Sequence, residues 1–168
     1  LGDVYKRQAK EKLFSGKRYI LTPNEKTDQN VVERVSGLWN SLGAVVSEMD
    51  AETHDQIFSS VSHLPHLLAY ASIQSIANSE TPEVLGHSGD GSKCFSRNAS
   101  SSPQMWYDNF LENSQNLLLR INTFKNVLNA LEDAVREKDK QKLIELLTQA
   151  KNLSLIHISE PTRRTPIS

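Results

Sequence analysis

The sequence predicts a mainly α-helical protein with one or two short strands near its start. Two observations carry this prediction: apolar residues recur at helical spacing over most of the chain, and strand-like runs occur only before residue 50. A third is that residues typical of helix N-caps, Asp28, Asp50 and Ser102, stand just before helical stretches. The pattern therefore favours a helical domain preceded by a small strand-containing element.

The first elements follow from apolar runs and from the residues that stop them. Residues 17–23 predict a short strand that ends at Pro23. A helix is expected from the cap at Thr27-Asp28 to Gly43, since its apolar residues share one face: Val31, Val32, Val35, Leu38, Trp39 and Leu42. Residues 44–49 predict a second short strand.

The next helix begins after Asp50 and contains an unusual segment, Ser62-His63-Leu64-Pro65-His66. Its apolar stripe runs from Ile57 to Ile76, and Pro65 is expected to bend it, since an interior proline costs about 3 kcal/mol. Histidine is seldom chosen to fill a core. From the residues alone, a ligand-facing imidazole and a hydrogen-bonded interior histidine are equally open.

The second half of the chain predicts a loop followed by long helices. Residues 78–102 lose periodicity and are rich in glycine and serine, which predicts a functional loop. Residues 103–137 predict one long helix, and Asp139 caps a last one. A long helix needs a long partner, which favours a homodimer, whereas a break near Asn113-Ser114 would allow a monomeric bundle. Pattern alone leaves both open.

Both ends of the chain are expected to be foreign to the protein. One allowed set of codons for residues 1–8 has a reverse complement that translates as residues 153–160, and this DNA resembles a transposase adapter used for sequencing libraries. We therefore interpret 1–8 and 153–168 as adapter-derived artefacts.

Composition excludes several classes of function. The net charge is −1 without a Lys/Arg run, so no nucleic-acid partner is expected. No apolar run reaches the roughly 20 residues of a membrane span. The single cysteine, Cys94, suits a reducing, cytoplasmic location. Too few ligands stand near His63 and His66 to predict a metal.

A few polar and aromatic residues remain as candidates for chemistry. Lys93 and Arg97 are four apart, and two cations beside a glycine-rich stretch suit a small dianionic ligand. The alternative is an ordinary solvated pair. His66 could orient a hydroxyl or carboxylate. Trp106 could cover a ring, although a core role is favoured for it alone.

Together these residues resemble the C-terminal part of the prephenate dehydrogenase family, which includes arogenate and cyclohexadienyl dehydrogenases. The resemblance covers nearly all of residues 9–152. It rests on these segments: Phe14-x-Gly16-Lys17-Arg18-Tyr19-Ile20-Leu21-Thr22-Pro23, His54-Asp55, Ser62-His63-Leu64-Pro65-His66, Gly91-Ser92-Lys93-Cys94-Phe95-Ser96-Arg97-x-Ala99, and Pro103-x-Met105-Trp106-x-Asp108-x-Phe110-x-x-Asn113.

The resemblance implies NAD(P)-dependent oxidative decarboxylation of prephenate to 4-hydroxyphenylpyruvate in tyrosine synthesis. It implies that residues 9–23 are a remnant of a nucleotide-binding Rossmann domain and that 24–152 form a helical dimerisation and substrate-binding domain. By position, Arg97 binds a substrate carboxylate, Lys93 lines the same pocket, His66 contacts the ligand, and Trp106 lies near the substrate or regulatory site. A homodimer is implied, with tyrosine as a possible feedback inhibitor.

The family's catalytic histidine and cofactor-binding glycines belong upstream of residue 9, so this truncated chain is expected to be inactive alone. Cys94 and Asn98 depart from the family pattern, which often has aspartate and an apolar residue there. The choices between prephenate and arogenate and between NAD and NADP therefore stay open. A non-catalytic helical dimerisation or amino-acid-sensing module is the alternative function.

Overall fold

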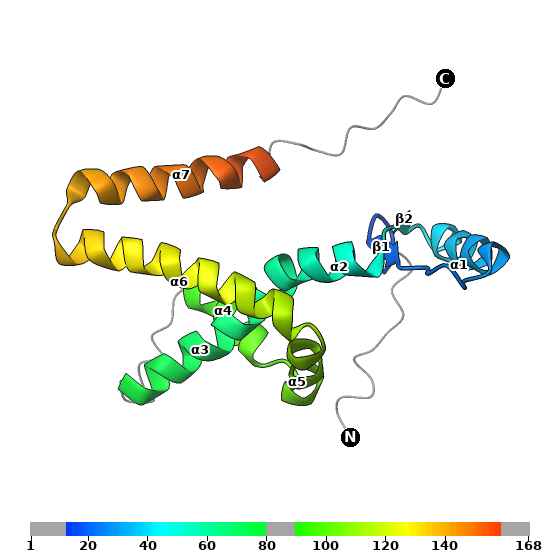
Figure 1. Ribbon diagram of the computed structural model, residues 1–168, viewed down its shortest axis with the longest axis horizontal. Helices are drawn as coiled ribbons and strands as arrows, with labels where there is room; N and C mark the ends of the chain where they lie inside the picture. Colours follow the sequence, from blue (N-terminus) through cyan, green and yellow to red (C-terminus); the bar gives the residue numbers. More distant parts are fainter. Residues whose placement is uncertain (1–12, 80–89, 159–168) are drawn as a thin grey trace. The chain divides into compact units, whose positions relative to one another are not determined.

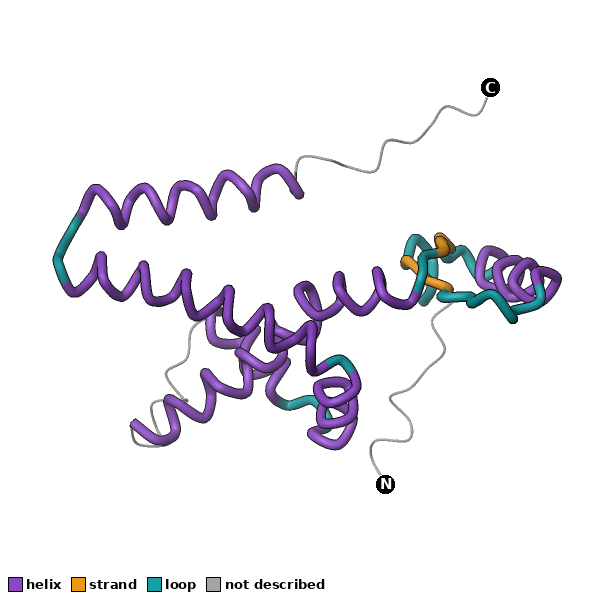
Figure 2. Tube along the Cα trace, in the orientation of Figure 1, coloured by secondary structure: helices purple, strands orange, loops and turns teal. Residues whose placement is uncertain are grey.

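The computed structural model describes residues 13–79 and 90–158 of the chain (Figure 1). The N-terminal residues 1–8 thus lie outside the described part. The chain divides into two compact units, residues 1–117 and 118–168, which are considered separately below. The mainly helical fold class predicted from the sequence is confirmed, because two short strands are followed by a succession of helices (Figure 2).

The first described elements form a parallel βαβ unit. Strand β1 (Arg18–Leu21) pairs with β2 (Val45–Glu48), and helix α1 (Gln29–Ser41) connects them. Parallel strands need such a crossover connection, because a tight turn would leave the second strand antiparallel to the first. The Asp28 carboxylate caps α1 by accepting from the Asn30 N–H, and Gly43 closes the helix with φ +82°. Both predicted strands and the predicted cap are confirmed.

The helix after Asp50 is interrupted just before Pro65. It consists of α2 (Ala51–Phe58), a π-helical turn η2 (Ser59–His63) and α3 (Leu64–Ser79). The Leu64 N–H donates to the Ser59 carbonyl, five residues back, where an α-helix would reach four. The irregularity expected at Pro65 is therefore a widened turn on its N-terminal side, which accommodates a ring that would otherwise meet the preceding turn.

The loop predicted over residues 78–102 is wrong in part. Helix α3 continues to Ser79, and residues 90–99 form helix α4 (Asp90–Ala99), which packs against α3. The glycines Gly86 and Gly89 lie outside the described residues. Serine and glycine have low intrinsic helix propensity, but packing against a neighbouring helix stabilises a helix by more than this propensity costs. The sequence pattern shows only the low propensity.

The stretch predicted as one long helix is two helices. Helix α5 (Pro103–Glu112) ends at Asn113, and α6 (Ser114–Arg136) begins directly after it. The break that was one of the two alternatives is thus present at Asn113-Ser114, and by itself it does not decide between a dimer and a monomer. The buried side chains of this part include Ala69, Trp106 and Leu117.

The second unit contains most of α6 and helix α7 (Lys140–Ile158), between which the chain reverses direction (Figure 2). Asp139 caps α7 by accepting from the Lys142 N–H at 3.0 Å, as predicted. Helix α7 includes residues 153–158, whose adapter origin stays a prediction. Many large apolar side chains of these two helices are at least 49% exposed: Leu118, Leu119, Val127, Leu128, Val135, Ile144, Leu147, Leu153 and Leu155.

Candidate functional site

His66 lies on α3 and is held on two sides. Its Nδ1 donates a hydrogen bond to the Ser62 carbonyl at 2.9 Å, and its ring stacks on Trp106 with centroids 3.8 Å apart and planes at 22°. A carbonyl only accepts, so Nδ1 carries a proton and Nε2 is the ring nitrogen left for another partner. The stack brings together two predicted site residues that are 40 positions apart in the sequence.

His63 lies in the π-helical turn and is held by the opposite kind of bond. Asn113 Nδ2 donates to His63 Nδ1 at 3.4 Å, and the His63 ring meets Trp106 edge-on at 6.1 Å. Burial lowers the pKa of His63, and the nearby imidazoles of His54 and His66 lower this pKa further while the Asp55 carboxylate opposes them. His63 is therefore held neutral at physiological pH.

Trp106 is the centre of this ring cluster. Its side chain is only 6% exposed and packs against Phe110 at 5.4 Å as well as against both histidines. Its Nε1 is buried and has no acceptor among the described residues. This burial agrees with the core role that the sequence favours for an isolated tryptophan, and the role of Trp106 beside a ligand stays a prediction.

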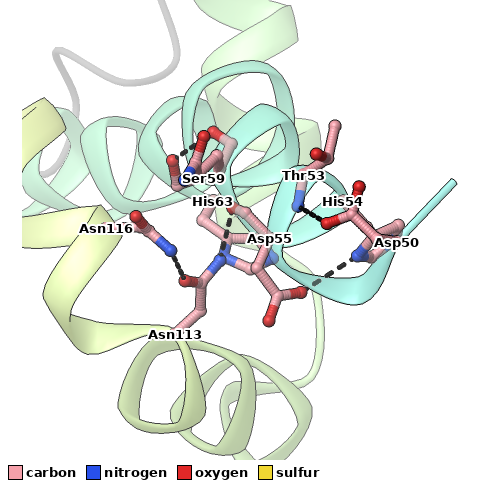
Figure 3. A network of polar contacts seen from close by, with 9 residues as sticks. Asp50, Thr53, His54, Asp55, Ser59, His63, Asn113 and Asn116 are labelled. Atoms are coloured by element: carbon pink, nitrogen blue, oxygen red, sulfur yellow. Dashed lines mark hydrogen bonds and ion pairs between the residues drawn. The ribbon is translucent and has the colours of Figure 1, made fainter. Parts of the chain in front are cut away.

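A histidine–aspartate pair, His54 and Asp55, lies in α2 at the start of the same helical run. His54 Nδ1 donates to the Asp55 carboxylate at 3.0 Å, and the His54 ring stacks on Phe58 at 4.2 Å. The Asp55 backbone carbonyl accepts from Asn113 Nδ2 at 2.8 Å, which links this pair to the histidine cluster (Figure 3). Sequence reasoning named His54 and Asp55 but did not reveal this link, because it uses a backbone atom.

Lys93 and Arg97 lie on helix α4, and both are exposed. The Arg97 guanidinium donates to Cys94 Sγ at 3.9 Å, within its own helix. Among the described residues, no hydrogen bond or ring contact joins Arg97 to the histidine–tryptophan cluster. The structure thus brings His66 and Trp106 together, and it leaves the Arg97 side chain exposed on α4.

Three other kinds of feature would indicate a different site in the described residues: a metal site, a membrane-spanning helix and a groove. Within residues 13–79 and 90–158, no group of three or more His, Cys, Asp or Glu side chains could hold a metal ion. The helices of the same ranges include none that is long and apolar enough to cross a membrane. An open groove of about 210 Å³ in the βαβ unit is mostly apolar and is lined by Leu21, Thr22, Pro23, Thr27, Val31, Val32 and Val35.

The fold and the site define a class of protein before any comparison is made. A parallel βαβ unit is the building block of nucleotide-binding sheets. Here it precedes a helical domain in which the rings of His63, His66 and Trp106 form a cluster. Helix α4, which packs against α3, carries two cations. This combination indicates a protein with an α/β part of the nucleotide-binding type followed by a helical part.

Comparison with known families agrees with this class and narrows it. Residues 50–149 match the prephenate dehydrogenase dimerization domain, and residues 6–48 match the prephenate dehydrogenase nucleotide-binding domain. The chain therefore belongs to the prephenate dehydrogenase family. The two matches meet between residues 48 and 50, whereas the boundary expected from the sequence lies after residue 23; the position of the boundary stays a prediction.

Individual relatives give the same result. The chain is 35% identical to prephenate dehydrogenase of Bacillus subtilis over 86% of its length, and 31% identical to cyclohexadienyl dehydrogenase of Zymomonas mobilis over 85%. It spans 39% and 50% of these two proteins. Prephenate dehydrogenase of Aquifex aeolicus, solved with hydroxyphenyl propionate and NAD+, aligns with a TM-score of 0.78 and 38% identity, covering 88% of this chain and 52% of that one.

Proposed function

We propose that this chain is the helical dimerisation and substrate-binding part of an NAD(P)-dependent prephenate dehydrogenase, together with the end of its nucleotide-binding domain. The reaction transfers a hydride from the hydroxyl-bearing ring carbon of prephenate to NAD(P)+ and releases carbon dioxide, which leaves 4-hydroxyphenylpyruvate. The observation that carries the proposal is the stack of His66 on Trp106, which brings two family motif residues into contact.

The residues of this chain would bind and orient the substrate. Arg97, with a planar fork of donors, would hold a carboxylate, and Lys93 would add charge on the same helix. His66 would form a hydrogen bond to the ligand through Nε2, since its Nδ1 is used by Ser62. Trp106 would cover one face of the six-membered ring.

The cofactor, NAD or NADP, would be held mainly by the part of the nucleotide-binding domain that lies upstream of residue 9. In nucleotide-binding folds the pyrophosphate meets a glycine-rich turn between a strand and its helix. The turn from β1 to α1, residues 22–28, contains no glycine. This βαβ unit therefore does not supply the phosphate-binding turn, and no catalytic residue is assigned within the chain.

Ligand binding tests the proposed site directly. Titration of the 168-residue chain with 3-(4-hydroxyphenyl)propionate, followed by NMR, should shift the signals of His66 and Trp106. Arg97→Ala should weaken this binding about tenfold or more, because a charge-assisted hydrogen bond contributes about 1.5–3 kcal/mol. Lys125→Ala removes an exposed cation from α6 and serves as control. An absence of binding, or equal affinity of the two variants, contradicts the proposal.

Activity requires the rest of the nucleotide-binding domain. When the chain is joined to the upstream residues of the Bacillus subtilis relative, NAD(P)H formation should appear with prephenate. Arogenate should be offered in parallel, because one relative is a cyclohexadienyl dehydrogenase. Turnover of neither compound by a folded, dimeric fusion would favour the non-catalytic sensing module.

We also propose a homodimer, regulation by tyrosine and a cytoplasmic location. The match to a dimerization domain and the exposed apolar side chains of α6 and α7 support the dimer. The lone cysteine supports a reducing compartment. Sedimentation should give twice the chain mass, and tyrosine should compete with 3-(4-hydroxyphenyl)propionate for binding.

A further inference from the structure

Asn113 is a buried amide at the junction of α5 and α6. It is 8% exposed, and its side chain contacts three other parts of the first unit (Figure 3). Its Nδ2 donates to the Asp55 carbonyl at 2.8 Å and to His63 Nδ1 at 3.4 Å, and its Oδ1 accepts from Asn116 Nδ2 at 2.9 Å. A buried polar group with several partners is costly to disturb.

The orientation of this amide is fixed by the backbone. The Asp55 carbonyl can only accept a hydrogen bond, so the atom of Asn113 that faces it must be the NH2 group. Turning the amide over would bring two oxygens together at this short distance. Because the same NH2 group faces His63, the Nδ1 atom of this imidazole lies opposite a hydrogen-bond donor, whichever protonation state the ring would otherwise prefer.

A donor facing His63 Nδ1 determines where the imidazole proton lies. Nδ1 must carry a lone pair, so the proton of the neutral ring is on Nε2. His66 has the reverse arrangement, since its Nδ1 donates to the Ser62 carbonyl. The two histidines of one five-residue segment are thus set in opposite tautomers by two different carbonyl groups, those of Asp55 and Ser62.

We propose that Asn113 is a positioning residue that holds His63 as the neutral Nε2–H tautomer and thereby fixes the π-helical turn beside the His66–Trp106 stack. Protonation of His63 would place two donors against each other and break the link between α2, η2 and the α5–α6 junction. The charged or titratable groups that act on His63 are Asp55 and His54 of α2 and His66 of α3. The importance of this role for substrate rests on the function proposed above.

The tautomers can be read without any ligand. Two-bond proton–nitrogen NMR spectra of the 15N-histidine-labelled chain above pH 7 should show His63 as Nε2–H and His66 as Nδ1–H. In Asn113→Ala the His63 signal should move toward a mixture of tautomers, and its pKa should rise. Asn113→Asp, with an acceptor in place of the donor, should move the His63 proton to Nδ1.

Controls separate positioning from folding. Asn116→Ala removes the neighbour of Asn113 Oδ1 but leaves the donor to His63, so the His63 signal should stay as Nε2–H. The His66 signal reports in every variant whether the segment is folded. An Nδ1–H pattern for His63 in the unaltered chain, or an unchanged pattern in Asn113→Ala with His66 intact, overturns the proposal. A failure of ligand binding with the expected tautomers would overturn the proposed function and leave this inference standing.

Discussion

The histidine–tryptophan cluster and helix α4 carry the two halves of the proposed ligand site, and they are held in different ways. In the cluster, His63, His66 and Trp106 are fixed by ring contacts and by bonds to Asn113 and Ser62. On α4, Arg97 and Lys93 are exposed, long side chains. The cluster is thus preorganised by folding, whereas the exposed Arg97 would lose most of its side-chain freedom only on binding the proposed carboxylate.

This difference separates stability from binding. Substitutions in the cluster should damage the fold first, because they remove buried contacts. Substitutions of the cations should leave the fold intact and affect affinity. Three measurements test this contrast, in decreasing order of the expected change in the free energy of unfolding.

The largest effect is expected for Trp106→Ala. Removing a buried aromatic side chain typically costs about 3–5 kcal/mol, and this one also supports the ring of His66. Urea unfolding followed by circular dichroism measures the change. Tyr107→Ala, which alters the adjacent residue at 57% exposure, is the matched control and should change stability by less than about 0.5 kcal/mol. Equal losses in both variants would mean that the cluster is not the core of this unit.

A smaller effect is expected on acidification and depends on His63. Its folded pKa lies below the ordinary value of 6.5, so the unfolded chain binds more protons in this range and stability must fall as the pH decreases through 6.5. The contribution is fully present above that pH. His63→Gln should flatten this part of the stability curve, measured by urea unfolding from pH 8 to pH 5. A slope that is unchanged in the variant would assign the pH dependence to other groups.

The smallest effect on folding is expected for Arg97→Ala. The side chain is exposed and bonds only weakly within α4, so the free energy of unfolding should change by less than about 0.5 kcal/mol. The same variant should lose most of its affinity for 3-(4-hydroxyphenyl)propionate, as described above. A large loss of stability would show that Arg97 belongs to the framework, and it would remove the contrast between the two regions.

Local signals in the sequence were sufficient for most elements. Asp28, Asp50 and Asp139 cap helices where they were expected to, since capping depends on a few neighbouring residues. Helix α4 was missed because its stability comes from packing against α3, which no local pattern records. The break at Asn113 was one of two open alternatives, since apolar spacing continues across it.

The sequence by itself determined the mainly helical fold, the irregular segment around Pro65 and the family motifs, because these depend on residue type and short spacing. Only the tertiary structure decided that His66 stacks on Trp106 and that Asn113 donates to His63. These contacts join residues 40 and 50 positions apart, and they depend on backbone carbonyls whose direction is set by the packing of helices. The same residue type, histidine, therefore takes opposite tautomers within one five-residue segment.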